Sequence, residues 1–287
     1  MITAYDLQNL RLYIAEWKLS GNSIAFVPTM GNLHDGHLSL LKEAGEWADR
    51  TVVSIFVNPI QFGRGEDYEQ YPSTLAQDSR KLEALGLDLL FAPDLKQLYP
   101  GGIDEDTRVT VPGLSNILCG EFRPTHFPGV ATVVCKLFVN IMPDVALFGE
   151  KDYQQLLVIQ RMVSDLCMPV KIIGMPIMRE ADGLAMSSRN SYLNPEQRSI
   201  APRIYKVLCL AADRLRQDPG SINSIEREGM DTLLASGFKP EYFSVRRTAD
   251  LEVPGPADTH LSILTAAWLG PARLIDNVRV ELAAGPR

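Results

Sequence analysis

Cysteine is scarce in this chain and is not arranged in pairs. The 287 residues include four cysteines, and no two of them form a CxxC pattern. Zinc ribbons and small disulfide scaffolds both need closely spaced cysteines. These classes are therefore excluded, and we expect the thiols to be free and mostly buried. The cysteines are Cys119, Cys135, Cys167 and Cys209.

Long apolar runs and a basic excess are also missing. No run reaches the roughly 18–20 apolar residues that a membrane span needs. The acidic residues Asp6 and Glu16 interrupt the first segment, so no export signal is visible and we expect no membrane partner. The 35 acidic residues exceed the 28 basic ones, which gives a net charge of −7. This charge argues against a nucleic-acid partner, but it is compatible with a small anionic ligand, which responds to the local field.

The first part of the chain alternates short apolar runs with helical patterns. Segments 23–27 and 51–57 have the composition of buried strands, and the apolar residues of segment 38–48 recur at helical spacing. Strands that are apolar throughout and alternate with helices are typical of a parallel sheet covered on both faces. The sequence therefore predicts an α/β fold with a doubly wound parallel sheet.

The pattern changes after about residue 183. Asn194, Pro195 and Gln197 form a strong helix start, from which we expect one helix to about residue 217. A second helix and three strand patterns without long intervening helices follow. We therefore predict a first domain over residues 1–182 and a smaller C-terminal α+β domain over residues 183–287.

The loop after the first of these strands carries the clearest chemical signal. Residues 28–37 have the sequence PTMGNLHDGH and lead into a helix. Ligands of α/β sheets bind beyond the carboxyl ends of the strands, and a helix N-terminus favours phosphate. His34 and His37 lie three residues apart, so both imidazoles can donate hydrogen bonds to phosphate oxygens. The alternative is half of a metal site, for which the sequence offers no third ligand nearby.

Three further polar segments follow strands or join the two domains. Asn58 and Gln61 carry amides suited to hydroxyl and carboxylate groups, although turn formation also explains Asn58. Lys151 suits phosphate as a point charge, and Asp152 suits a helix cap, Mg²⁺ or a ribose. Segment 186–190, with the sequence MSSRN, suits phosphate binding or a polar linker.

Arg123 and His126 lie in one more polar loop, over residues 120–127. Their side chains could face the ligand site or make a subunit or loop contact. The sequence leaves both interpretations open.

Five segments in order resemble one family. PTMGNLHDGH resembles the HxGH signature of a nucleotidyltransferase superfamily, and MSSRN takes the place of its KMSKS-type loop. Together with VNPIQF, GEKDYQQ and RLIDN, they resemble the pantothenate synthetase (pantoate–β-alanine ligase) family. The resemblance extends from Phe26 to Val280.

The resemblance implies a fold, a reaction and partners. The fold would be a Rossmann-like domain that binds nucleotide and pantoate, followed by a small lid domain. The reaction would join D-pantoate to β-alanine with ATP, giving pantothenate, AMP and pyrophosphate through a pantoyl adenylate. The family is usually a homodimer, is cytoplasmic in bacteria and uses Mg²⁺.

The resemblance also implies roles for individual residues. Gln61 would contact pantoate and β-alanine, and Gln155 would contact pantoate. Catalysis would depend on His34, His37, Lys151, Ser187, Ser188 and Arg189, with His37 as the proton donor. The residues implied to bind ATP are Met30, Gly31, Asn32, Leu33, His34, Asp35, Gly36, His37, Gly149, Glu150, Lys151, Asp152, Met178, Met186, Ser187, Ser188 and Arg189.

The implied Mg²⁺ site departs from the family pattern. Residues 77–81 have the sequence QDSRK, where some members carry paired aspartates. Only Asp78 remains as a metal ligand. Mg²⁺ would then be carried by the ATP phosphates, as it commonly is.

Three alternatives remain open at this point. The chain could be another small-acid adenylating ligase or nucleotidyltransferase of the same superfamily. It could also be a catalytically silent nucleotide-binding protein, or a structural or interaction protein. A tRNA ligase is disfavoured because the chain is short and acidic and lacks an anticodon-binding domain.

Overall fold

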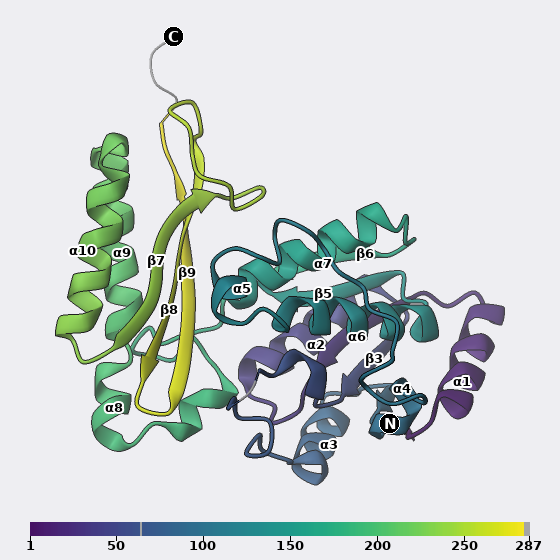
Figure 1. Ribbon diagram of the computed structural model, residues 1–287. Helices are drawn as coiled ribbons and strands as arrows, with labels where there is room; N and C mark the ends of the chain where they lie inside the picture. The colour runs from purple at the N-terminus through teal and green to yellow at the C-terminus, as the bar shows by residue number, and fades with distance from the viewer. Residues whose placement is uncertain (64, 284–287) are drawn as a thin grey trace. The chain divides into compact units, whose positions relative to one another are not determined.

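The computed structural model describes residues 1–63 and 65–283 (Figure 1). The chain divides into two compact units. Unit 1 comprises Met1–Glu150 and Val158–Pro176, and unit 2 comprises Lys151–Leu157 and Ile177–Arg287. The functional division into a binding domain over 1–182 and a lid domain over 183–287 stays a prediction.

Unit 1 is built on a parallel sheet, as the sequence predicted. Within the described ranges its six strands have the order β1-β4-β3-β2-β5-β6, and every neighbouring pair is parallel. The strand order reverses between β2 and β5, which is where ligands of such sheets bind. The strands are β1 Ile2–Ala4, β2 Ile24–Thr29, β3 Arg50–Ile55, β4 Leu89–Phe91, β5 Val145–Gly149 and β6 Lys171–Met175.

Helices cover both faces of this sheet because alternate strand residues point to opposite sides. On one face, Ala25 and Val27 of β2 pack in a cluster with Leu41 of α2 and Leu82 of α3. On the other face, the ring of Phe26 meets the edge of Phe138 of α6, with 6.2 Å between ring centroids. The helices and 3₁₀ turns up to β6 are α1 Leu7–Leu19, α2 Asp35–Trp47, η1 Pro59–Gln61, α3 Leu75–Ala84, α4 Leu95–Leu98, α5 Cys119–Phe122, α6 His126–Ile141, η2 Glu150–Asp152 and α7 Tyr153–Asp165.

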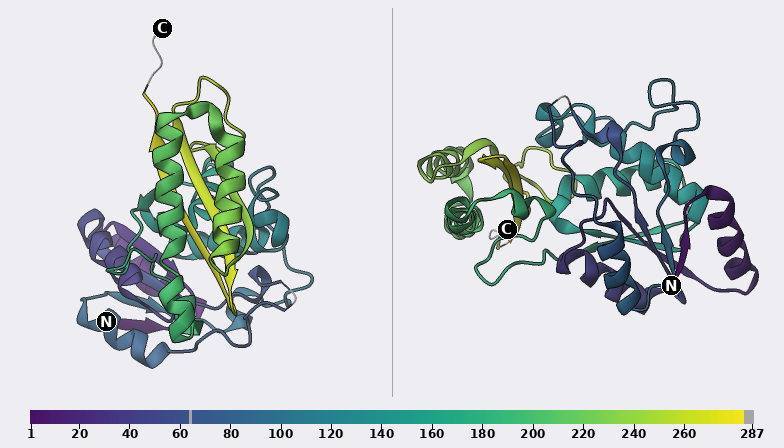
Figure 2. Two further views of the ribbon diagram at one scale, coloured as in Figure 1. Left: turned by 90° about the vertical axis from the view of Figure 1, so that its left-hand side faces the viewer. Right: turned by 90° about the horizontal axis from the view of Figure 1, so that it is seen from below.

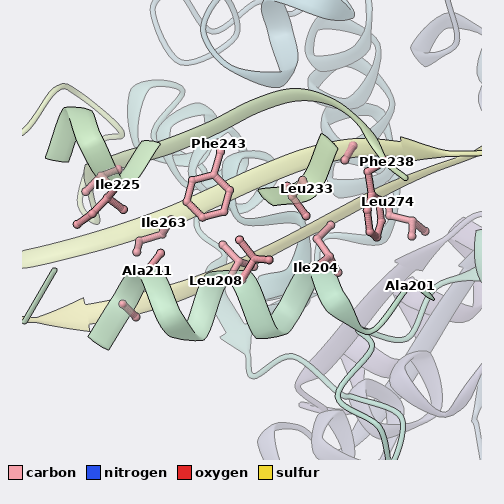
Figure 3. Packing of buried hydrophobic residues seen from close by; sticks show 14 of the residues in the cluster. Ala201, Ile204, Leu208, Ala211, Ile225, Leu233, Phe238, Phe243, Ile263 and Leu274 are labelled. Carbon is pink, nitrogen blue, oxygen red and sulfur yellow. The ribbon is translucent and has the colours of Figure 1, made fainter. Parts of the chain in front are cut away.

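Unit 2 contains a separate antiparallel sheet with strand order β7-β8-β9. The helices α9 and α10 lie against one face of it (Figure 2). Leu208 of α9, Leu233 of α10 and Phe243 and Ile263 of the strands fill the space between the layers (Figure 3). The predicted small α+β unit is thereby confirmed. Its elements are η3 Ser188–Tyr192, α8 Pro195–Ile200, α9 Arg203–Gln217, η4 Pro219–Ser221, α10 Ile222–Ala235, β7 Lys239–Arg247, β8 His260–Leu269 and β9 Ala272–Glu281.

One expected helix is in fact two. The predicted start is correct, because Asn194 and Gln197 form a reciprocal capping box at the N-terminus of α8. The helix then ends at Ile200, and α9 begins at Arg203. Pro202 explains the interruption, since it has no amide hydrogen to donate to the carbonyl of Arg198, four residues earlier.

The described part of the chain also has no helix long and apolar enough to cross a bilayer. This agrees with the absence of long apolar runs in the sequence.

Replacing glycine by alanine should have opposite effects on stability at two helical positions. Gly229 of α10 faces Phe243, and an added Cβ would overlap the phenylalanine ring. Gly229→Ala should therefore lower the free energy of unfolding by about 1–3 kcal/mol through overpacking. Gly45 of α2 is exposed and has open space around it, so Gly45→Ala should raise stability by about 0.5–1 kcal/mol. Thermal melts of both variants test this, and a melting temperature that rises in Gly229→Ala would contradict it.

Candidate active site

The motif loops follow two adjacent strands at the point where the strand order reverses. Residues 30–34 follow β2, and Gly149 and Glu150 lie at the end of β5. The two strands pair in parallel, with Ala25 opposite Val145 and Phe26 opposite Ala146. Their carboxyl ends therefore lie at the same edge of the sheet, where α/β proteins bind their ligands.

The loop after β2 is held in place from α3. Gly31 and Asn32 have positive φ angles of 83° and 50°, which turn the backbone amides that follow toward α3. Asp78, only 1% exposed, accepts the Asn32 amide at 2.8 Å and the Leu33 amide at 2.9 Å. Lys81 donates to the Leu33 carbonyl at 2.6 Å. The loop therefore owes its conformation to side chains 45–48 positions later in the sequence.

These contacts bear on the expected Mg²⁺ ligand. Both carboxylate oxygens of Asp78 already accept hydrogen bonds, including one from the Thr74 hydroxyl at 2.8 Å. No group of three or more His, Cys, Asp or Glu side chains that could hold a metal ion occurs among residues 1–63 and 65–283. The residues around Asp78 thus do not fit a protein-held magnesium, and they fit a loop anchor instead.

His34 and His37 form a capping box at the start of α2. The Nδ1 atom of His34 accepts the Gly36 amide at 3.2 Å, and Nδ1 of His37 accepts the His34 amide at 3.4 Å. A ring nitrogen that accepts a backbone N–H carries no proton, so each neutral ring carries its proton on Nε2. The two rings also lie against each other, with 4.0 Å between centroids and an angle of 35° between their planes. The cap therefore uses Nδ1 of each imidazole, and the Nε2–H donor of each ring is directed away from the backbone.

Gln61 is oriented by a chain of hydrogen bonds within unit 1. Tyr99 donates to Oδ1 of Asn58 at 2.9 Å, and Nδ2 of Asn58 then donates to the Gly129 carbonyl at 3.1 Å and to Oε1 of Gln61 at 3.3 Å. Burial raises the pKa of Tyr99 above its ordinary value, which keeps its hydroxyl a donor. The side-chain amide of Gln61 therefore points its Nε2 toward Met30, whose sulfur lies 2.9 Å away.

The main chain of Gln61 is fixed by the two residues that the sequence left open. His126 donates from Nδ1 to the Gln61 carbonyl at 3.0 Å, and Nη2 of Arg123 approaches the same oxygen at 3.4 Å. Arg123 also forms a two-point ion pair with Glu66. Of the two interpretations offered by the sequence, these contacts show a loop contact.

Close packing completes the Gln61 environment. A Cβ on Gly129 of α6 would lie 2.7 Å from the Cα of Gln61. Glycine is therefore required there for α6 to pack against η1. Sequence reasoning missed Gly129 and Tyr99, because neither lies in a recognisable pattern.

Unit 2 contains the remaining predicted residues. Lys151 is 19% exposed and its ammonium lies 3.6 Å from the Asp152 carboxylate. Gln155 lies half-buried in the first turns of α7. Ser187 caps η3 by accepting the Arg189 amide at 3.3 Å, and Met178 and Met186 pair through a main-chain hydrogen bond of 3.0 Å. Unit 1 contains Met30 to His37, Gln61, Asp78, Gly149 and Glu150.

The family comparison agrees with this geometry. The model of the family described as "Pantoate-beta-alanine ligase" matches residues 3–279. The chain belongs to the pantoate–β-alanine ligase family. Members of this family form the C–N bond between pantoate and β-alanine, so the ligase interpretation of the sequence is confirmed.

Individual relatives of this ligase cover nearly its whole length. The pantothenate synthetases of Shewanella sp. (strain MR-7) and Azotobacter vinelandii (strain DJ) are 51% and 50% identical, over 98% and 99% of this chain and 100% of each relative.

Solved structures of the family have the same fold. Pantothenate synthetase from Thermus thermophilus has a TM-score of 0.89 at 44% identity, covering 97% of this chain and 99% of its own. Pantoate-beta-alanine ligase from Francisella tularensis, complexed with "Beta-gamma ATP and Beta-alanine", has a TM-score of 0.82 at 37% identity, covering 97% of both chains.

If Asp78 anchors the loop, its substitution should lower stability and turnover but leave the Mg²⁺ requirement unchanged. Asp78→Asn keeps the size of the side chain but presents an NH₂ group to one of the loop donors. Stability should fall by about 1–3 kcal/mol for the unpaired buried amide, and turnover by up to about 100-fold for the displaced loop. The Mg²⁺ concentration that gives half-maximal activity should not change.

Steady-state kinetics over a Mg²⁺ titration test this prediction. Thr74→Ser retains the hydroxyl that donates to Asp78 and is the matched control. A large increase in the Mg²⁺ requirement of Asp78→Asn, with normal turnover at saturating Mg²⁺, would instead identify a metal ligand.

Proposed function

We propose that this ligase forms pantothenate in two half-reactions. The carboxylate of D-pantoate first attacks the α-phosphorus of ATP and releases pyrophosphate, and the amine of β-alanine then displaces AMP from the pantoyl adenylate. The observation that carries the proposal is the contact between Gln61 and Met30. It joins an amide suited to a hydroxy acid directly to the loop suited to phosphates.

The first half-reaction needs positioning more than acid–base chemistry. A carboxylate of ordinary pKa, about 4, is already ionised at neutral pH and can attack without a base. Negative charge then grows on the phosphate oxygens, and groups that donate hydrogen bonds to them lower the barrier. The Nε2–H groups of His34 and His37 and the N-terminus of the 13-residue helix α2 are donors of this kind.

The second set of nucleotide ligands is proposed from unit 2 and the end of β5. Lys151 supplies a point charge, and Ser187, Ser188 and Arg189 supply hydroxyl and guanidinium donors for the phosphates. Met178, Met186, Gly149, Glu150 and Asp152 contact the rest of the nucleotide in this proposal. Gln155 contributes a second amide for pantoate.

The second half-reaction forms the C–N bond. The neutral amine of β-alanine attacks the carbonyl carbon of the adenylate, AMP leaves with the electrons of the broken C–O bond, and the new amide nitrogen releases one proton to water. Gln61 would contact both pantoate and β-alanine during this step. The solved Francisella relative, described as complexed with "Beta-gamma ATP and Beta-alanine", supports a family fold that accommodates both kinds of molecule.

Three further features belong to the proposal. Mg²⁺ would be held by the ATP phosphates rather than by the protein, which agrees with the three hydrogen bonds that Asp78 accepts from the loop and from Thr74. The ligase works as a homodimer in the cytoplasm, as its family resemblance implies. None of these features requires a nucleic-acid or membrane partner.

Pyrophosphate release tests the proposed order of reaction. With ATP, Mg²⁺ and D-pantoate alone, a burst equal to the enzyme concentration is expected, and added β-alanine should start continuous turnover. ATP binding without a pantoate-dependent burst would refute the substrate. A burst with another small acid would then indicate a different adenylating ligase, and no reaction with any acid would indicate a silent nucleotide-binding protein.

His37→Ala should slow adenylate formation by about 10²–10⁴-fold, because a positioned transition-state donor is lost. Single-turnover release of pyrophosphate measures this step directly. His260→Ala is the matched control, since His260 is exposed at the start of β8. Wild-type rates in His37→Ala would remove the proposed role.

Gln61→Ala should weaken pantoate binding by about 10- to 100-fold, the loss expected for a hydrogen bond to a charged group. The affinity for ATP should change much less, because the phosphate donors remain. Titration calorimetry with each ligand measures both affinities. Gln160→Ala, on an exposed position of α7, is the control, and unchanged pantoate affinity in Gln61→Ala would contradict the prediction.

A further inference from the structure

A short hairpin in unit 2 carries residues that we assign to the nucleotide. Arg179 and Ala185 form an isolated antiparallel bridge, and the Met186 amide donates to the Met178 carbonyl at 3.0 Å. The chain reverses at Gly183, where φ is 93°. A two-stranded hairpin is marginally stable by itself. Its conformation therefore depends on contacts with the rest of unit 2.

Arg179 makes these contacts with a single side chain. Its guanidinium donates to Oδ2 of Asp276 at 2.6 Å and to Oδ1 at 2.9 Å, a two-point ion pair. It also donates to the Gly183 carbonyl at 3.0 Å, which ties it to the tip of its own hairpin. The same guanidinium lies over the ring of Tyr205 in α9, with Cζ 3.6 Å from the ring centroid.

Asp276 of β9 is buried and depends on this partner. Its side chain is 0% exposed, and Oδ1 accepts the Asn277 amide at 2.8 Å in addition to Arg179. Burial raises the pKa of the Asp276 carboxyl above its ordinary value, and the hydrogen bonds from Arg179 oppose this shift. A buried charge that loses its partner is strongly destabilising, so the pair strongly favours the observed hairpin position.

Asn277 extends the same network to Lys151. Its side-chain Nδ2 donates to the Lys151 main-chain carbonyl at 3.1 Å, and its own carbonyl lies 3.4 Å from Nη2 of Arg179. Two consecutive residues of β9 therefore contact both the hairpin and the segment that begins at Lys151. Neither residue was assigned a role by sequence reasoning, although both lie in the RLIDN segment.

We propose that Arg179, Asp276 and Asn277 are positioning residues that fix the Met178–Met186 hairpin and Lys151 on β9 before ATP arrives. The inference rests on the proposed function, in which Met178, Met186 and Lys151 are nucleotide ligands. None of the three positioning residues needs to touch ATP. Because the hairpin and the Lys151 segment are already ordered, ATP binding does not bear the entropy cost of ordering them. That cost would reduce the affinity for ATP.

Arg179→Lys is the sharpest test. Lysine keeps a positive charge near Asp276, but it cannot form the two-point pair or stack on Tyr205 as arginine does. The dissociation constant for a non-hydrolysable ATP analogue should rise about 10-fold, as for the loss of one charge-assisted hydrogen bond. In steady-state kinetics, KM for ATP should rise by a similar factor, with a smaller change in kcat.

Arg273→Lys is the matched control. Arg273 pairs with Glu241 at 2.7 Å in the same sheet, and their side chains are only 9% and 14% exposed. This variant should show a comparable drop in melting temperature with ATP affinity unchanged. Asn277→Ala removes the side-chain contact with Lys151 and leaves the Arg179–Asp276 pair in place. It replaces Arg179→Lys if that variant fails to fold, and it should also weaken ATP binding.

Two results would overturn the positioning role. One is unchanged ATP affinity in a folded Arg179→Lys or Asn277→Ala protein. The other is equal weakening in Arg273→Lys, which would indicate a general effect of destabilising unit 2. Pantoate-dependent pyrophosphate release by the unaltered chain tests the proposed function separately, because the affinity comparison needs only ATP binding.

Discussion

The loop after β2 depends on a buried acceptor for its backbone amides. Positive φ angles at Gly31 and Asn32 leave the next amides without a helix or sheet partner, and an unpaired buried amide costs about 1–3 kcal/mol. Asp78 accepts both the Asn32 and the Leu33 amide. The loop so fixed leads directly to His34 at the N-cap of α2, which accepts the Gly36 amide. The capping box that orients both imidazoles therefore begins at a loop that Asp78 helps to hold.

In unit 2 a buried carboxylate also holds a short segment in place, but with different hydrogen-bond donors. There Asp276 accepts a guanidinium and a backbone amide, and the hairpin that it fixes is again too short to be stable alone. In both units, a buried carboxylate far away in the sequence determines the conformation of a loop with proposed ligands. This arrangement attaches short loop segments to a rigid helix or strand. Precise positioning of a reacting group requires such attachment.

How much of the structure the sequence predicts depends on how far apart in the chain the interacting residues lie. Alternating apolar strands and helices reveal the parallel sheet because the signal is local, and the Asn194–Gln197 capping box is local too. HxGH-type spacing places His34 and His37 at a helix start for the same reason. Asp78, Tyr99 and Arg179 act 46, 41 and 97 positions away from Asn32, Asn58 and Asp276. No periodicity in the sequence encodes such pairs, so the sequence offered Asp78 only as a remaining metal ligand and gave no role to Tyr99 or Arg179.

The anchoring carboxylates also explain how an acidic chain can bind a polyanion. The net charge is −7, yet binding depends on the field at the site rather than on the sum of charges. Asp78 lies in the first turn of α3, where the helix dipole favours a negative charge, and it also accepts two loop amides and a hydroxyl. Asp276 is matched by a guanidinium. Each carboxylate is thus stabilised where it lies, Asp78 by neutral hydrogen-bond donors and Asp276 by a guanidinium, so neither one is left as an isolated buried charge.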